Sequence, residues 1–235
     1  MTPSNNASVV LVHGAWADGS SWSKIIRSLT ADGIKTVAAP LPLTSFQEDV
    51  AALDRTLDRI SGPIILGGHA YAGAVIAATR SDKVKALVYV AALAPDEGET
   101  VADVFSRGTA HPQAPKLAPD AHGLIYLPDA AFPSAFAQNA TADELAVLTA
   151  TQRPLTPVCI TVPVPRPLWK DRPSWFLVAE QDYMIVRDNQ RAMAERMKAQ
   201  LRSHPVDHAP MVTAPTVVMD VLGEAIAAVR AATAR

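Results

Sequence analysis

The 235-residue sequence has little of what several functional classes require. A single cysteine, Cys159, excludes an internal disulfide framework and fits a reducing compartment. The formal net charge of −2 gives no electrostatic case for nucleic acid or for an anionic membrane surface. No apolar run approaches the roughly 20 residues that a membrane-spanning helix needs. We therefore expect neither a nucleic acid nor a membrane as partner.

Motifs for metals, nucleotides and export are also missing. The sequence contains no H-E-x-x-H, and His204 and His208 are expected in a strand and a loop, not on one helical face. No G-x-G-x-x-G follows a predicted strand and no P-loop is present, so we expect no metal and no cofactor. The polar start, residues 1–8, lacks the basic and apolar regions of a signal peptide. The expected location is the cytoplasm.

The residues that are present predict an α/β protein. Apolar residues make up 49% and charged residues 19%, an ordinary globular balance, and the length suits one domain over residues 1–235. Short apolar runs alternate with segments of helical periodicity, which predicts a mostly parallel sheet with helices on both faces. The expected strands are residues 8–12, 34–39, 84–92, 174–179 and 201–204, with another starting at residue 63. The expected main helices are residues 22–29, 46–60, 187–197 and 215–232.

A proline-rich stretch interrupts this alternation between residues 95 and 170. Short helices are expected within it at residues 99–105, 129–138 and 141–150. An insertion of this length in an α/β sheet is usually a lid over the active site, because function sits on loops that the sheet carries. We therefore expect residues 95–170 to form a helical lid within the single domain.

One stretch, residues 63–76, organises the rest of the chain. An apolar run leads into Gly-Gly-His-Ala-Tyr-Ala-Gly (67–73) and then into an alanine-rich helical pattern. This predicts a buried strand, a very tight turn and a helix packed on the strand. Small residues at Gly68, Ala72 and Gly73 allow the close approach. The layout is that of the Gly-x-Ser-x-Gly nucleophile elbow, but the apex residue is Ala70, whose methyl group cannot attack a carbonyl.

An acid and a histidine follow in the order that this elbow requires. Asp182 comes directly after the strand expected at 174–179, and His208 lies between the last strand and the closing helix. The carboxyl ends of parallel strands share one crevice, so these side chains are expected beside the elbow. Glu180 and Asp207 are alternative acids. We prefer Asp182 because it is the first acid in the loop proper.

At these residues the chain resembles the small α/β-hydrolases related to plant methylesterases, hydroxynitrile lyases and salicylate-binding esterases. The matching segments are residues 10–22, with Val-Leu-Val-His-Gly-Ala-Trp and Gly-Ser-Ser-Trp, residues 68–75, Asp182, and residues 207–215, with Asp-His-Ala-Pro-Met. The resemblance implies the α/β-hydrolase fold, with His208 as catalytic base and Asp182 as its orienting acid. It also implies an oxyanion hole formed by the backbone N–H groups of Ala15 and Tyr71. The chain departs from the family at Ala70.

Several aromatic and histidine residues are candidates for the substrate pocket. The candidates are His13, Trp16, Tyr126, Phe132 and Trp169. Core packing is the alternative for the aromatic residues, and His13 is also expected to shape the loop after the first strand. Ser20, Ser21 and Cys159 are not expected to replace the missing serine. The two serines begin a helix, and a lone cysteine in an apolar segment is usually a small buried hydrophobe.

Three hypotheses account for Ala70. In the first, the parent scaffold is a carboxylic-ester hydrolase for small apolar esters, and alanine replaces its serine so that a substrate complex is trapped. Losing that serine lowers kcat by roughly 2 × 10⁶, so the chain should be nearly inactive on esters. In the second, the His208–Asp182 dyad and the oxyanion hole carry out a lyase or decarboxylase reaction through an enolate. The resemblance supports this, because the family includes methylketone synthases with alanine at the elbow. In the third, the chain only binds a small ligand. The expected partner is a small molecule in each case, and a homodimer is left open.

Overall fold

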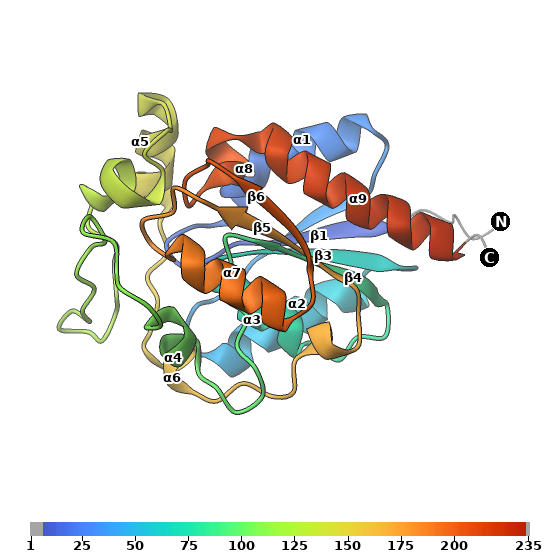
Figure 1. Cartoon of the computed structure of the whole chain (residues 1–235), viewed down its shortest axis with the longest axis horizontal. Helices are drawn as coiled ribbons and strands as arrows, with labels where there is room; N and C mark the ends of the chain where they lie inside the picture. Colours follow the sequence, from blue (N-terminus) through green and yellow to red (C-terminus); the bar gives the residue numbers. More distant parts are fainter. Residues whose placement is uncertain (1–6, 234–235) are drawn as a thin grey trace.

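The computed structural model describes residues 7–233 and contains a six-stranded parallel sheet with helices on both faces (Figure 1). The strand order is β2-β1-β3-β4-β5-β6. The strands are β1 (Ser8–Val12), β2 (Thr36–Ala39), β3 (Ile64–His69), β4 (Val84–Val90), β5 (Ser174–Ala179) and β6 (Gln200–His204). The predicted α/β class is confirmed. Most of the N-terminal stretch in which no signal peptide is expected, residues 1–6, lies outside the described residues.

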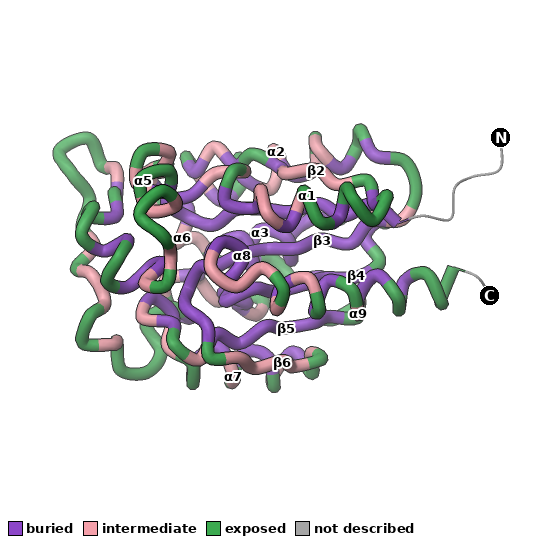
Figure 2. Tube along the Cα trace, turned by 90° about the horizontal axis from the view of Figure 1, so that it is seen from above, coloured by how far each residue is buried: buried purple, intermediate pink, exposed green. Residues whose placement is uncertain are grey.

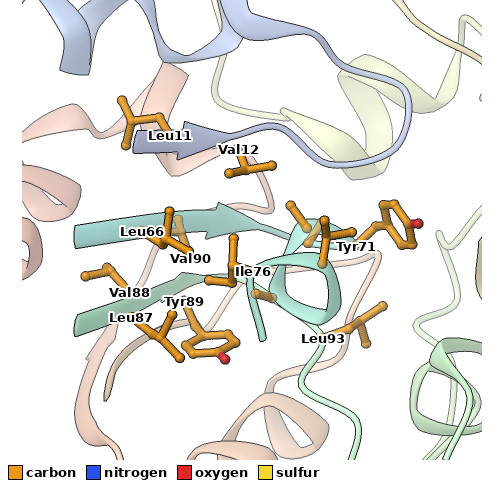
Figure 3. Packing of buried hydrophobic residues seen from close by; sticks show 14 of the residues in the cluster. Leu11, Val12, Leu66, Tyr71, Ile76, Leu87, Val88, Tyr89, Val90 and Leu93 are labelled. Atoms are coloured by element: carbon orange, nitrogen blue, oxygen red, sulfur yellow. The ribbon is translucent and has the colours of Figure 1, made fainter. Parts of the chain in front are cut away.

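Strands β1, β3 and β5 are buried along their whole length, and β4 is buried except at Lys85 (Figure 2). They are near-continuous apolar runs, because helices cover both faces of a parallel sheet and leave no side that faces water. Strand β6 at the sheet edge is only partly buried, and its sequence is correspondingly polar. Figure 3 shows part of the resulting core, in which Leu66 of β3 lies in register with Leu87 of β4.

Two groups of helices cover the sheet. Helices α1 (Ser23–Ala31) and α9 (Pro215–Thr233) pack against each other, and α9 lies on β4 and β5. The other face carries α2 (Phe46–Asp58), α3 (Ala72–Ala78) and α7 (Arg187–Arg196) (Figure 1). A 3₁₀-helix η1 (Gly19–Trp22) precedes α1. The four-residue helix α8 (Pro210–Thr213) was not predicted, because a single turn has no periodicity to detect. None of the described helices has both the length and the apolar character needed to cross a bilayer.

Most of the segment between β4 and β5 gathers at one end of the sheet, away from both termini, and its last part, residues 168–173, returns beside α3 to the start of β5 (Figure 1). It contains α4 (Val101–Phe105), α5 (Ala142–Thr151), α6 (Val158–Thr161), the 3₁₀-helix η3 (Leu168–Lys170) and η2 (Phe132–Phe136). The helix expected at 129–138 is only the five-residue π-helical turn η2. That this segment acts as a lid, and that the chain forms one domain, stay predictions.

Candidate active site

The turn between β3 and α3 has the backbone geometry of a nucleophile elbow. Ala70, at its apex, has φ +49°, a left-handed conformation that costs a residue with a Cβ about 1–2 kcal/mol. The Ala70 carbonyl accepts hydrogen bonds from Gly73 N (3.1 Å) and Leu93 N (2.9 Å), which hold the turn closed. A Cβ on Gly73 would lie 2.4 Å from the Leu93 oxygen, so only glycine fits there. The turn is therefore strained, closely packed and fixed by its neighbours.

A buried histidine–carboxylate pair lies beside this turn. His208 Nδ1 and Asp182 Oδ2 are 2.8 Å apart, and both side chains are buried. An ionised carboxylate can only accept hydrogen bonds, so Nδ1 carries the proton that is donated to Asp182. The other ring nitrogen, Nε2, is then left without a proton. His208 is thereby prepared to act as a base.

Asp182 is held in place by three further donors. Its Oδ1 accepts hydrogen bonds from the backbone N–H groups of Met184 (2.7 Å) and Ile185 (2.8 Å). Its Oδ2 accepts a second bond from Gln190 Nε2 at 2.7 Å. Gln190 is fully buried, and its own oxygen accepts from Ala179 N. These donors replace water around the carboxylate and fix its orientation.

The alternative acids have other partners. Glu180 accepts hydrogen bonds from Arg191 and Ser203 at the sheet edge. Asp207 is buried, but its Oδ1 accepts from Thr213 Oγ1 (2.6 Å) and its Oδ2 from Asn139 N (3.0 Å). Neither carboxylate bonds to the His208 ring within residues 7–233. The structure pairs His208 with the acid that the sequence favoured.

His69 holds the main chain of His208 in place. Its Nε2 donates a hydrogen bond to the His208 carbonyl at 2.7 Å, and the two rings lie 4.6 Å apart. The edges of Phe136 meet both rings. Burial, with the neighbouring His208 as a second cause, lowers the pKa of His69 well below its ordinary value. His69 is therefore neutral and fixes the main chain of His208.

A small cavity of about 40 Å³ joins the elbow to the base. Its wall is formed by Ala15, Trp16, Ala70, Tyr71, Leu93, Phe105, Met184, Ile185 and His208. The structure thus brings together the predicted apex residue, the base, both expected oxyanion-hole residues and Trp16. Sequence reasoning missed Leu93, Phe105, Met184 and Ile185, because loop residues carry no periodic signal that shows which way they face.

Two residues of this wall have backbone amides that are free to bind a ligand oxygen. Within residues 7–233, the N–H groups of Ala15 and Tyr71 donate to no protein acceptor. The loop that carries Ala15 is fixed nearby: Trp16 has φ +58°, and its indole Nε1 donates to Ile125 O at 2.9 Å. A Cβ on Gly14 would lie 3.0 Å from the Ala70 methyl group, so the loop and the elbow are in direct contact. Two amide donors beside a base are the components of an oxyanion hole.

Four of the expected pocket residues do not line this cavity. His13 shapes its loop instead: its Nδ1 bonds to Gly14 O and its Nε2 accepts from Leu41 N (3.0 Å). Tyr126 is 47% exposed, because it follows the inward-facing Ile125 in an extended segment where successive side chains alternate. The other two are buried in the β4–β5 segment, namely Phe132, which packs on Phe136, and Trp169 of η3.

The residues considered as replacement nucleophiles are occupied elsewhere. Ser20 Oγ and Ser21 Oγ both donate to Asp18, at its side chain and its carbonyl, where they fix the start of η1. Cys159 is buried beside Thr156, and burial raises the pKa of its thiol to about 11. Within the described part of the chain, no group of three His, Cys, Asp or Glu side chains is arranged to hold a metal ion.

Comparisons with known proteins concern the fold and the family of the chain. No curated protein matches the sequence. A pyrethroid hydrolase from Sphingobium faniae JZ-2 is similar in structure, with 21% identity over 94% of this chain and 98% of its own, and a TM-score of 0.82. A methylesterase from Arabidopsis is 18% identical over 94% and 99% of the two chains, with a TM-score of 0.76.

A third solved structure is an extracellular alpha/beta-hydrolase from a Paenibacillus species, described as sharing structural and functional homology with tobacco salicylic acid binding protein 2. It is 19% identical over 93% of this chain and 98% of its own, with a TM-score of 0.70. At these identities the likeness concerns the fold. The family model described as "Alpha/beta hydrolase family" matches residues 9–221. This chain therefore belongs to the alpha/beta hydrolase family.

Proposed function

We propose that this protein carries out cofactor-free lyase or decarboxylase chemistry on a small apolar carbonyl compound. His208 moves the proton, Asp182 orients His208, and the amides of Ala15 and Tyr71 hold the oxygen of an enolate. One observation carries the proposal: the elbow, the dyad and the two amides are assembled around a residue, Ala70, that has no nucleophilic atom. Backbone strain of this kind persists at functional sites, and here it serves the Tyr71 amide.

Decarboxylation of a β-keto acid shows how these residues act. The bond between the carboxylate and the α-carbon breaks, carbon dioxide leaves, and the electron pair passes into an enolate. The enolate oxygen accepts hydrogen bonds from the N–H groups of Ala15 and Tyr71, as a tetrahedral oxyanion does in ester hydrolysis. His208 Nε2 takes the proton of the carboxylic acid as the carbon–carbon bond breaks and then gives that proton to the α-carbon, so the ring ends in the protonation state in which it began. Asp182 stabilises the protonated ring without leaving its four donors.

The cavity wall favours this reaction. Apart from His208 its side chains are apolar, and within the described residues no lysine or arginine lines it. A carboxylate that loses its hydration in such surroundings is destabilised relative to carbon dioxide and a neutral ketone. The same surroundings strengthen the two amide hydrogen bonds to the enolate oxygen.

The test compares the protein with His208→Ala on acetoacetate and on longer 3-oxo acids, with carbon dioxide release as the measurement. A general acid–base contributes about 10²–10⁴-fold, so the variant should lose that factor. His204→Ala is the matched control, because His204 lies at the end of β6 and does not line the cavity. Equal rates for all three proteins would overturn the proposal.

Ester hydrolysis is the second candidate, because the solved structures similar to this chain include a hydrolase and a methylesterase. On this hypothesis the scaffold suits small apolar esters, and alanine at residue 70 makes the chain nearly inert. Ala70→Ser should then raise turnover of p-nitrophenyl acetate by about 10³-fold or more, since losing a triad serine costs roughly 2 × 10⁶. If Ala70→Ser gains nothing, the esterase hypothesis fails. If neither reaction occurs but a ligand binds, the protein is a binder.

A further inference from the structure

A buried carboxyl group lies behind the oxyanion hole and takes no part in the chemistry above. Asp49, in the first turn of α2, is fully buried and has no ion-pair partner within residues 7–233. Its Oδ2 accepts a hydrogen bond from Tyr71 Oη, and its Oδ1 accepts one from Leu43 N, each at 2.7 Å. The protein therefore buries an acid whose main contact is the side chain of an oxyanion-hole residue.

Tyr71 is consequently fixed at both ends. Its backbone lies at the apex of the elbow and lines the cavity, while its ring extends away from the strands (Figure 3). The hydroxyl at the far end of the ring is tied to Asp49, and the ring is buried. The Ala70–Tyr71 peptide is held at its carbonyl by Gly73 N and Leu93 N, and the bond to Asp49 holds the side chain of the residue that carries the amide. A shift of the Tyr71 main chain away from the cavity would pull on the ring and strain its bond to Asp49.

The same carboxyl group is connected to the segment between β4 and β5. Leu43, which Asp49 holds, has φ +60°, and its carbonyl accepts from Thr156 N at 3.1 Å. The side chain of Thr156 donates to Thr44 O at 2.7 Å, and Cys159 follows within the same turn. Asp49 thus connects α2, the elbow and the β4–β5 segment. Burial raises its pKa, against the opposing effects of Tyr71, Leu43, Cys159 and Arg153.

We infer that Asp49 is a positioning residue: it acts through the Tyr71 hydroxyl to hold the Tyr71 backbone amide towards the reacting oxygen. The inference rests on the proposed function, because that function assigns the amide its role. Asp49 itself touches neither the cavity nor the base. Its contribution should appear where negative charge develops on oxygen and not in the binding of a neutral substrate.

The test uses Tyr71→Phe and Asp49→Asn, with Tyr89→Phe as matched control. Tyr89 is also a fully buried tyrosine, but within the described residues its hydroxyl has no partner and it does not line the cavity. Each change is made in the Ala70→Ser background to measure kcat and KM for p-nitrophenyl acetate. Each is also made in the unaltered chain, where p-nitrophenolate and neutral nitrobenzene serve as probes of binding by absorbance titration.

Tyr71→Phe and Asp49→Asn should each lower kcat about tenfold with KM unchanged, and weaken p-nitrophenolate binding about tenfold with nitrobenzene binding unchanged. Their double variant should be no worse than either alone, because both break one connection. If both behave like Tyr89→Phe in kcat and in phenolate binding, the inference is wrong, whatever their melting temperatures. The p-nitrophenolate titration tests the role of Asp49 even if Ala70→Ser has no esterase activity, because it measures binding and needs no turnover. A failure of the proposed function can therefore be distinguished from a failure of this inference.

Discussion

The two halves of the candidate active site are built differently. On the β5 and α7 side the functional groups are side chains: Asp182 accepts four hydrogen bonds, and one of them, from His208 Nδ1, orients the His208 ring. On the β3 and α3 side it lies in the backbone, in the conformation of Ala70 and the amide of Tyr71. A side-chain nucleophile can therefore be absent while the backbone half stays intact. The comparison predicts that exchanging functional groups in the first half lowers the rate, whereas adding side-chain volume in the second half lowers the stability of the fold.

Asp182→Asn should have the largest effect on activity. An asparagine of the same shape stabilises the wrong tautomer of His208, and the corresponding change in a serine triad lowers kcat by about 10⁴. The melting temperature should change far less than the rate. Glu180→Gln is the control, because Glu180 bonds only to Arg191 and Ser203. A rate for Asp182→Asn within tenfold of that control would remove Asp182 from the mechanism.

Gly73→Ala should be the most damaging change in the elbow half, and its effect should be on stability. The new methyl group would meet the Leu93 oxygen at 2.4 Å, and forcing atoms into such a space typically costs 1–3 kcal/mol or more. Gly223→Ala in α9 is the matched control, since a Cβ there meets nothing within 4 Å. That variant should gain about 0.5–1 kcal/mol, because alanine favours a helix interior. Urea unfolding measures both, and equal values would contradict the packing of the elbow.

Gln190→Leu should have an intermediate effect on the acid–base half. It removes one donor from Asp182 and leaves Ala179 N without its acceptor, a loss of about 1–3 kcal/mol for a buried polar group. We expect a several-fold lower kcat together with a displaced pH–rate profile, because the orientation and charge of Asp182 determine the basicity of His208. Gln190→Glu keeps the shape but places a second carboxyl beside the first. If the pH profile of both variants matches that of the unaltered protein, Gln190 only supports the fold.

The smallest effects should appear as opposite dependences of stability on pH. Burial of the Glu99 carboxyl raises its pKa, but hydrogen bonds from Asp96 N, Arg107 and Arg196 outweigh this effect and lower the pKa to about 2. The stabilisation from Glu99 is therefore present above pH 4.5 and is lost as the pH falls towards 2. Asp49 has a raised pKa, so its contribution is present below pH 3.8 and is lost as the pH rises through its folded value.

Melting temperatures between pH 2 and pH 8 test this contrast. Glu99→Gln should lower the melting temperature at pH 6, and the difference should vanish near pH 2. Asp49→Asn should be less destabilising at pH 8 than at pH 3, or even stabilising, because it removes a buried group that favours its protonated form. Parallel curves for both variants would mean that neither carboxyl titrates with a shifted pKa.

Much of the sheet could be predicted from the sequence. Strands β1 and β5 begin and end at the predicted residues, because each is a short apolar run with polar or turn residues on either side. The elbow was also predictable, since only a tight turn explains small residues at Gly68, Ala72 and Gly73 together. Asp182 and His208 followed from the rule that the carboxyl ends of parallel strands share one crevice.

The surroundings of the site could not be predicted in the same way. Gln190 lies on a helix that was predicted, but nothing local shows which side of α7 faces Asp182. Asp49 similarly meets Tyr71 across 22 residues of sequence, through a contact that exists only after α2 packs on α3. Tyr126 was placed in the pocket because it is aromatic, whereas the neighbouring Ile125 occupies the inward position. Such contacts depend on helix rotation and loop paths, on which composition and spacing carry no information.

The volume of about 40 Å³ beside His208 has a kinetic consequence. It accommodates a water molecule, whereas ligand sites usually measure 300–1,000 Å³. On the proposed function we therefore expect the wall to widen when a substrate binds, and the parts of the wall that we expect to give way are Phe105 at the end of α4, which is 39% exposed, and the Met184–Ile185 loop. Association should then be gated: the observed binding rate will level off at high ligand concentration, at the frequency with which the entrance opens.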